Sequence, residues 1–467
     1  MTVLTLCAQL WRQLYLSRFA RRQSQTLRQL ANRNWLQLYK TSTNWRRGAA
    51  RRVLLGDAPV STQTSVRESV LPRPPRAPRI RRAPEPPDTV LAFHGHLYFT
   101  ASRTDPLPIV TIRESLPGGG SQIRGTVRSH TLELYWSRRR ANTTAPSFHI
   151  TELQLDTKLQ LAPSRALRLV IFYSTGQLAL FDVDAQTLVA RETATARLGE
   201  ARDGRVAEHV ALARLSSPLL VALTSDCALK MWRIRKAGCA ELEPDVELVE
   251  LELSFRAHSI GSPAMLCLTP QGTAYCVTLV YATAILLGGS ISIQQFLIGL
   301  DGRVAQRHTS IRAYHDSWTT SIEFAAPFIV ASRADNTIDV FRLQEGEHDE
   351  RQDVRDERQD VRDDRRAMRD DFWRFEVSPL RLSHVRTLFG HTGGVRSVAL
   401  CSDRCVSGGV DGVKVWELAQ GQHVDVGEHP RALANVKKLF FDEHKIVSIV
   451  SDSTPAAKEH VKLLRFD

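Results

Sequence analysis

The chain has 467 residues, and its apolar fraction of 43% is ordinary for a globular protein. A net charge of +12 indicates acidic partners such as nucleic acid or acidic or phosphorylated protein, unless it reflects only a basic linker and a basic amino-terminal segment. The seven cysteines include no CxxC pair, and Cys401 and Cys405 are too isolated for a zinc site, so the set fits a reducing compartment.

Two stretches were tested as targeting or membrane segments. The first residues lack a preceding basic region and a following cleavage site, so they do not read as a secretory signal. The uncharged stretch from Gly272 to Leu300 is long enough to cross a bilayer, but Gly288 and Gly289 interrupt it. We therefore expect two strands there, Tyr275–Leu287 and Ser290–Leu300, and a cytoplasmic or nuclear protein.

Residues 1–56 have a helical pattern, in which Leu10, Trp11, Leu14 and Tyr15 fall near helical spacing. The stretch from Trp11 to Tyr15 resembles the closing helix of an F-box, with its Trp-x-x-Leu-Tyr. This resemblance implies an F-box-like helix that faces an adaptor. It covers only the last part of an F-box, so either the opening helices lie upstream of Met1 or adaptor binding has been lost. A short helical cap or a docking helix pair is the simpler alternative.

Residues 57–88 form a linker, because proline alternates with arginine from Leu71 to Asp88. Proline at this density blocks helices and sheet ladders and favours an extended chain. The segment is a solvated spacer or, alternatively, a basic surface for nucleic acid.

From residue 89 to 467 the sequence repeats short strands and turns. The strands form about seven units, each of three or four strands, and this self-similarity predicts an all-β protein built as a β-propeller. We expect the strands within Val90–Phe99 to join those near Val447–Phe466, because closing the ring removes exposed edges. Three charged heptads in Asp349–Arg369 predict an insertion at 345–374, as a solvated helix or a disordered loop.

The clearest unit runs from Leu388 to Leu418. It contains Gly390-His391, a strand ending near Leu400, Ser407, Asp411 and Val415-Trp416. These residues resemble one WD40 repeat, and the resemblance implies that His391, Ser407, Asp411 and Trp416 form a buried hydrogen-bond chain that holds the blade together. Weaker copies of the turn aspartate are Asp226 in an earlier unit, followed by Trp232, and Asp335, followed by Phe341.

The whole layout is similar to fungal-type F-box/WD40-repeat proteins, since Asn44–Gly48 resembles their segment between F-box and propeller. The resemblance implies a substrate-recognition subunit of a cullin-type (SCF) ubiquitin ligase, with a Skp-type adaptor and a cullin as partners and a protein substrate, often phosphorylated. One alternative is a WD40 scaffold without a ubiquitin role, and another is a basic RNA-associated protein.

Motifs for catalysis or cofactor binding were not found. The sequence contains no P-loop, HExxH or GxSxG motif, and its histidines are not arranged with an acid and a nucleophile in a recognisable order. We therefore expect no catalytic residues, no metal and no cofactor, and a protein that is not an enzyme.

Overall fold

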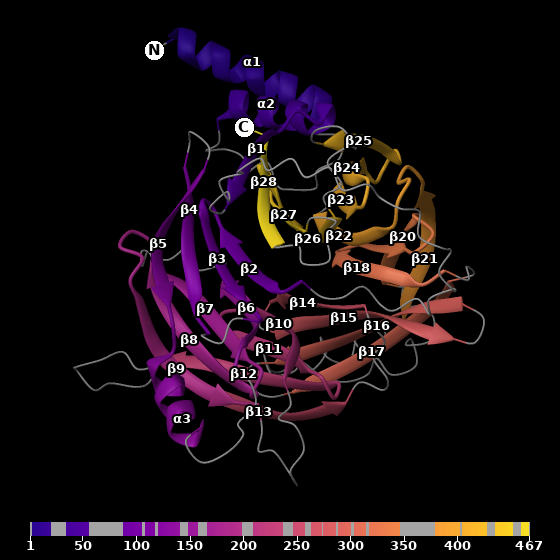
Figure 1. Cartoon of the computed structure of the whole chain (residues 1–467). Coiled ribbons are helices and arrows are strands. Elements are labelled where there is room, and N and C mark those ends of the chain that lie inside the picture. Colours follow the sequence, from indigo (N-terminus) through magenta and orange to yellow (C-terminus); the bar gives the residue numbers. More distant parts are fainter. Residues whose placement is uncertain are drawn as a thin grey trace, which may run out of the picture.

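The strands of the chain are organised in seven four-stranded antiparallel sheets within the part that the structure describes. The computed structural model describes residues 2–19, 34–55, 87–104, 108–116, 120–140, 148–156, 166–198, 209–236, 246–256, 263–272, 274–285, 288–299, 303–313, 317–345, 379–401, 404–426, 435–451 and 459–466. The first strands of neighbouring sheets lie side by side around a ring. The fold is therefore a seven-bladed β-propeller, and the predicted all-β class is confirmed (Figure 1).

The blades follow one another along the chain, each from its innermost to its outermost strand. Blade 1 comprises β2 (Thr89–His94), β3 (Leu97–Ser102), β4 (Val110–Ser115) and β5 (Ser121–Val127). Blade 2 comprises β6 (Ile150–Asp156), β7 (Ala166–Tyr173), β8 (Gln177–Asp184) and β9 (Ala190–Arg197). Blade 3 comprises β10 (Val210–Ser216), β11 (Leu219–Thr224), β12 (Ala228–Lys236) and β13 (Val246–Arg256).

Blade 4 comprises β14 (Ala264–Gln271), β15 (Ala274–Ile285), β16 (Gly288–Gly299) and β17 (Val304–Ala313). Blade 5 comprises β18 (Thr319–Ala325), β19 (Phe328–Arg333), β20 (Ile338–Glu345) and β21 (Leu380–Leu388). Blade 6 comprises β22 (Val395–Cys401), β23 (Arg404–Gly409), β24 (Gly412–Glu417) and β25 (Gln422–Val426). Blade 7 comprises β26 (Asn435–Phe441), β27 (Lys445–Ser451), β28 (Glu459–Arg465) and β1 (Arg51–Leu55).

The strand directions define two faces of the propeller. Because every sheet is antiparallel and the chain passes from each outermost strand to the next innermost one, all innermost strands run the same way. We call the face where they begin the entry face and the opposite face the exit face. Hairpin turns between second and third strands, such as residues 410–411, lie on the entry face, and those between third and fourth strands lie on the exit face.

Inner strands such as Leu219–Thr224 are buried along their whole length because both sides of each sheet face another blade. Each of the seven interfaces between blades has its own cluster of buried side chains. A β-bulge within the first three or four residues recurs in five of the innermost strands, β6, β10, β18, β22 and β26. A bulge increases the local twist, so its repetition helps the blades to follow the curvature of the ring.

The ring closes differently from the sequence prediction. Strands β2 and β3, which contain Val90–Phe99, belong to their own blade, so the expectation that they join the carboxy-terminal strands is wrong. They pack on blade 7 without pairing with its strands: Leu91 and Tyr98 lie against Val447, and the Thr89 N–H donates to the Glu459 carboxylate over 2.7 Å. Residues 51–55, placed in the helical segment by the sequence, form β1 and pair with β28. The amino-terminal strand therefore supplies the fourth strand of the last blade.

Three helices accompany the propeller in the described residues: α1 (Thr2–Phe19), α2 (Trp35–Arg47) and α3 (His130–Arg140). Helices α1 and α2 lie beside β1, β28 and β25 (Figure 1). The strand pair expected within 272–300 is confirmed as β15 and β16. The linker at 57–86 and most of the charged insertion, from residue 346, lie outside the described residues. The insertion joins two paired strands, since Glu345 at the end of β20 is opposite Leu380 in β21.

Candidate functional site

Blade 6 brings together the four residues for which the sequence predicts a hydrogen-bond chain. Trp416 Nε1 donates to Ser407 Oγ over 2.7 Å, and Ser407 Oγ lies 2.6 Å from His391 Nε2. His391 Nδ1 lies 2.6 Å from Asp411 Oδ1. Gly412, which follows the aspartate, has a φ of +110° and so allows a tight turn that other residues rarely adopt. The chain runs through the blade from β24 to the turn on the entry face.

The donors and acceptors of this chain fit a neutral histidine. The Trp416 indole can only donate, so the Ser407 hydroxyl donates its own proton to His391 Nε2, and Nδ1 carries the proton given to Asp411. Burial lowers the pKa of His391, with the hydrogen bond to Asp411 acting in the opposite direction. Burial also disfavours the Asp411 carboxylate, but hydrogen bonds from His391 and the Thr392 N–H together outweigh it and lower the pKa of Asp411. The chain is thus complete near neutral pH.

Blades 3 and 5 carry the weaker copies of the motif. In blade 3, Thr224 Oγ1 is hydrogen-bonded to Asp226, and Trp232 is buried. In blade 5, Asp335 Oδ1 accepts from the Thr337 N–H at 3.1 Å, and Phe341 is buried in the tryptophan position. Each aspartate therefore stabilises its turn, and a large aromatic side chain fills the core behind it.

Blade 5 also contains a buried ion pair that sequence reasoning missed. The side chains of Arg333 and Asp339 are paired and only 4% and 1% exposed. Thr387 Oγ1 donates to Asp339 Oδ1 over 2.7 Å, and His384 Nε2 lies 3.4 Å from the same carboxylate. These contacts join β19, β20 and β21, so the pair belongs to the core of the blade.

The amino-terminal helices pack on each other through aromatic rings. Tyr15 of α1 is buried, and its ring lies 5.7 Å from that of Trp35 at the start of α2. Trp11 lies 5.4 Å from Tyr39 in the same way. Trp11 and Tyr15, two of the predicted F-box-like residues, therefore hold the helix pair together.

The other two predicted residues of α1 lie on its surface. Leu10 is 53% exposed and Leu14 is 38% exposed. They are four positions apart, so they share one face of the helix. An adaptor could bind to this exposed face of α1. That role of Leu10 and Leu14 stays a prediction.

A second set of contacts fixes α2 to the propeller. Trp45 is 1% exposed and stacks on Phe466 with 3.7 Å between ring centroids. Its Nε1 donates to the Glu443 carbonyl oxygen over 2.8 Å, and Asn44 Nδ2 donates to that of Phe466 over 3.2 Å. Gly48 ends the helix in the left-handed conformation, where a Cβ would lie 2.5 Å from a carbonyl oxygen of β25. These contacts position the helices on the exit face at blades 6 and 7.

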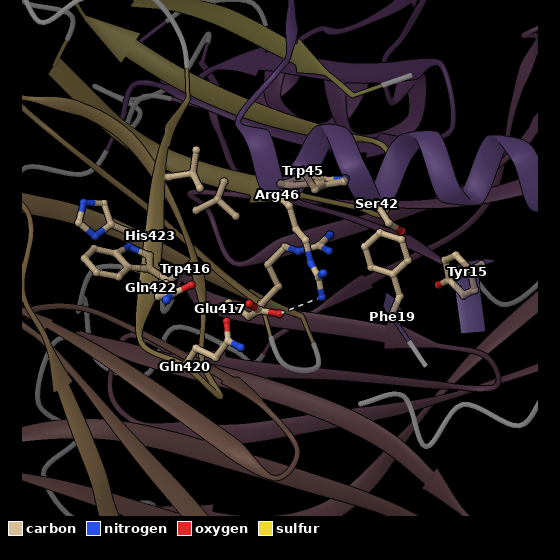
Figure 2. A pocket seen from close by; sticks show the side chains of 13 residues that line it. Tyr15, Phe19, Ser42, Trp45, Arg46, Trp416, Glu417, Gln420, Gln422 and His423 are labelled. Carbon is tan, nitrogen blue, oxygen red and sulfur yellow. Dashed lines mark ion pairs between the residues drawn. The ribbon is translucent and has the colours of Figure 1, made fainter. Parts of the chain in front are cut away.

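A cavity lies between these helices and blade 6 (Figure 2). Its volume is about 570 Å³. The helices contribute Tyr15, Phe19, Ser42, Trp45 and Arg46. Blade 6 contributes Arg404, Val415, Trp416, Glu417, Gln420, Gln422, His423 and Val424. The described lining therefore combines aromatic and aliphatic side chains with two guanidinium groups, one carboxylate and two side-chain amides.

Both arginines of the cavity lie over aromatic rings. The Arg46 guanidinium carbon is 4.5 Å from the centre of the Phe19 ring, and that of Arg404 is 4.5 Å from the Trp45 ring. Arg46 Nη2 also lies 3.6 Å from Glu417 Oε1, the ion pair drawn in Figure 2. The rings and the carboxylate hold both guanidinium groups in place at the junction of helices and blade.

The entry face presents large apolar side chains to solvent. Trp318, just before β18, is 60% exposed, and Phe389, just before β22, is 71% exposed. Val410, in the turn between β23 and β24, is 37% exposed. Exposed aromatic side chains are enriched where proteins bind each other, so this face is a candidate contact surface.

Within the described residues, no group of three or more His, Cys, Asp or Glu side chains could hold a metal ion. No described helix is both long enough and apolar enough to pass through a membrane. The expectations of no catalytic residue and no cofactor stay predictions.

No protein-family model matches the sequence, and no curated protein matches it. Among solved structures, the computationally designed protein Ika8 is similar, with 14% identity and a TM-score of 0.42, over 82% of this chain and 98% of that one. Sqt1 from Saccharomyces cerevisiae is similar with 12% identity and a TM-score of 0.41, over 81% of this chain and 86% of that one. These values carry no argument about function, and the seven sheets themselves establish the fold.

The cavity and the closing strand were not found by sequence reasoning. Trp45 and Arg46 lie within Asn44–Gly48, which resembles the segment between F-box and propeller. That resemblance was the one indication in the sequence that these residues contact the propeller. Nothing in the sequence indicated that Arg404 lines a cavity, because a lone arginine at the start of a short strand belongs to no motif. Only folding brings it to Trp45.

Proposed function

We propose that this protein is a binding scaffold that serves as the substrate-recognition subunit of a cullin-type ubiquitin ligase, with the propeller holding a protein substrate and the amino-terminal helices holding a Skp-type adaptor. The propeller fold is compatible with protein binding in general. The ligase role is the finer part of the proposal, and it extends the resemblance of residues 1–56 to an F-box.

The observation that supports this proposal best is the fixed attachment of α2 to the propeller. Trp45 is buried against Phe466 and hydrogen-bonded to the turn after β26, so the helix pair cannot swing freely. A ligase subunit needs such rigidity, because the substrate must be held at a defined place relative to the transferring partner. A flexible tether would lose that advantage.

The positions of the exposed apolar groups support the same arrangement. Leu10 and Leu14 are exposed on the helices, which sit on the exit face, whereas Trp318 and Phe389 are exposed on the entry face. Two partners can therefore bind at once without overlapping.

The test is co-purification of partners with the full-length chain. The wild type should recover a Skp-type adaptor and a cullin, and a Leu10→Asp, Leu14→Asp variant should lose both. The matched control, Gln9→Asp with Gln13→Asp, places the same charges on exposed neighbours in α1 and should keep them. Absence of adaptor and cullin from the wild-type preparation would refute the ligase role.

A scaffold without a ubiquitin role is the second candidate, and the exposed aromatic residues of the entry face favour it equally. It predicts partners that are lost on Trp318→Ala with Phe389→Ala but unaffected by the Leu10 and Leu14 changes. Partner recovery from these two variants separates the candidates.

A further inference from the structure

We propose that the cavity between α1, α2 and blade 6 binds an acidic peptide segment of a partner protein, in which a carboxylate side chain lies next to an apolar one. This site is separate from the exposed face of α1 and from the entry face. It does not depend on the ligase role.

The charge of the cavity favours an anionic group. Arg46 and Arg404 contribute two guanidinium groups, and Glu417 is the single carboxylate among the lining residues that the structure describes, so these residues carry more positive than negative charge. The Arg46–Glu417 distance of 3.6 Å is longer than a charge-assisted hydrogen bond of about 2.8 Å. An arriving carboxylate can therefore approach Arg46 more closely than Glu417 does.

The size and the remaining lining favour a peptide. A volume of about 570 Å³ is within the range of ligand cavities. Phe19 and Val424, which are half-buried, offer apolar surface for a side chain. Gln420 and Gln422 carry amide groups that can both donate to and accept from a peptide backbone.

The walls of the cavity are already ordered. Arg404 lies over Trp45, which the propeller holds through Phe466, and Arg46 lies over Phe19. Guanidinium groups held over rings lose less freedom when a ligand binds, which strengthens binding.

The same contacts argue against a nucleic acid as the ligand. Single-stranded nucleic acids bind proteins through open aromatic faces and a row of cationic groups. Here one face of Phe19 and one of Trp45 are covered by arginines, and the cavity holds only two cationic side chains with a carboxylate near one of them. A peptide carboxylate fits this balance of charges better than a phosphate backbone does.

The probe is a random peptide library displayed on phage and selected on the immobilised full-length protein, with prior depletion on the Arg46→Gln variant. Enriched peptides should carry Asp or Glu next to an aromatic or aliphatic residue. One enriched peptide is then labelled with fluorescein, and its dissociation constant is measured by anisotropy for the wild type and three variants.

The three variants distinguish the effect of a charge in the cavity from the effects of net charge and of unfolding. Arg46→Gln should weaken binding by about tenfold, because it removes a charge-assisted contact. Glu417→Gln should strengthen binding by about fivefold, because it removes the competing carboxylate. Arg47→Gln, the neighbouring exposed residue of α2 that does not line the cavity, should leave the constant within about twofold. A variant that merely unfolds cannot bind more tightly, so Glu417→Gln keeps the test informative.

Several results would overturn the proposal. One is a library that enriches no peptide, or peptides without carboxylates. Equal effects of Arg46→Gln and Arg47→Gln would show that only net charge matters. Binding of a labelled oligouridine that depends on Arg46 would make this a phosphate site. The two proposals fail separately, because absence of adaptor and cullin from the wild-type preparation, with peptide binding retained, would refute the ligase role and leave the peptide site supported.

Discussion

At the scale of single residues, the hydrogen-bond chain from Trp416 through Ser407 and His391 to Asp411 shows how a buried polar network can stabilise an all-β blade. Each member is both donor and acceptor for its neighbours, or ends the chain, so no buried group in it is left without a hydrogen bond. A network of this kind stabilises only when it is complete. Substituting one member leaves the others buried without their partner.

We therefore expect Asp411→Ala to lower the stability of the protein by about 2–3 kcal/mol, since it leaves the buried His391 Nδ1–H and the Thr392 N–H without an acceptor. Urea unfolding followed by intrinsic fluorescence measures the loss. Arg396→Ala in the same blade is the control, because that side chain is exposed and lies outside the hydrogen-bond chain, so its loss should change stability little. Wild-type stability together with loss of a partner would contradict the structural role of Asp411.

The protonation of His391 predicts a dependence of stability on pH. Burial lowers its folded-state pKa, with smaller contributions from Lys414 and His423, so below the unfolded value of about 6.5 the unfolded chain binds more protons than the folded one. Stability is then present above this pH and falls as the pH drops below it, by up to about 1.4 kcal/mol per pH unit.

Thermal unfolding between pH 7.5 and 5.5 measures this effect. His391→Gln should start less stable but show a shallower decline, whereas His308→Gln, which replaces an exposed histidine of β17, should follow the wild-type slope. Identical slopes for the wild type and His391→Gln would exclude this histidine as the source.

At the scale of elements, α2 and β1 form one unit that joins the helices to the ring. Asn34 caps the helix through its side chain, Gly48 ends it in the left-handed conformation, and the chain continues from there into β1. Trp45 is inserted in the interface between blades 6 and 7, where it belongs to the same apolar cluster as Val415 and Leu464. The helix is therefore part of the propeller core and not an appended segment.

Trp45→Ala should lower stability by about 3–5 kcal/mol, because it removes a fully buried indole and leaves a cavity between two blades. Trp318→Ala is the matched control, since that indole is 60% exposed. Differential scanning calorimetry compares the two, and limited proteolysis should show earlier cleavage near α2 in the first variant only. Equal melting temperatures would contradict the docking described here.

At the scale of the whole molecule, the propeller separates two surfaces. The helices and the cavity lie on the exit face, and the exposed Trp318, Phe389 and Val410 lie on the entry face. Both surfaces depend on a closed ring, because an open ring would let blades 1 and 7 move apart and would expose strand edges. The closing pair of β1 and β28 is therefore the element on which the arrangement depends.

Two truncations test the closure. A chain starting at residue 34 keeps α2 and β1 and should give a monodisperse protein with a cooperative melt. A chain starting at residue 56 lacks β1 and Trp45, so it should aggregate or melt at a clearly lower temperature. Size-exclusion chromatography and thermal unfolding compare them, and equal behaviour of both truncations would refute closure by β1.

The sequence alone determined the repeating part of this protein. Apolar residues and turn residues act over a few positions, so the three inner strands of the unit at Leu388–Leu418, the strand pair within residues 275–300 and the number of units could be predicted. The motif at His391, Ser407, Asp411 and Trp416 was readable for the same reason, since these residues lie within β22 to β24 of one blade and the segments that flank these strands.

The tertiary structure decided the closure and the cavity. Trp45 and Glu443 are 398 residues apart in the sequence. The paired strands β1 and β28, and the cavity residues Arg46 and Arg404, are also far apart in the sequence. Short strands such as Arg51–Leu55 carry no local information about their partner, because any edge strand of the right length can accept their hydrogen bonds. Only in the completed ring does the edge of β28 lie next to α2, where β1 can pair with it. This pairing fixes the helices beside blade 6, so that Arg46 and Arg404 line one cavity.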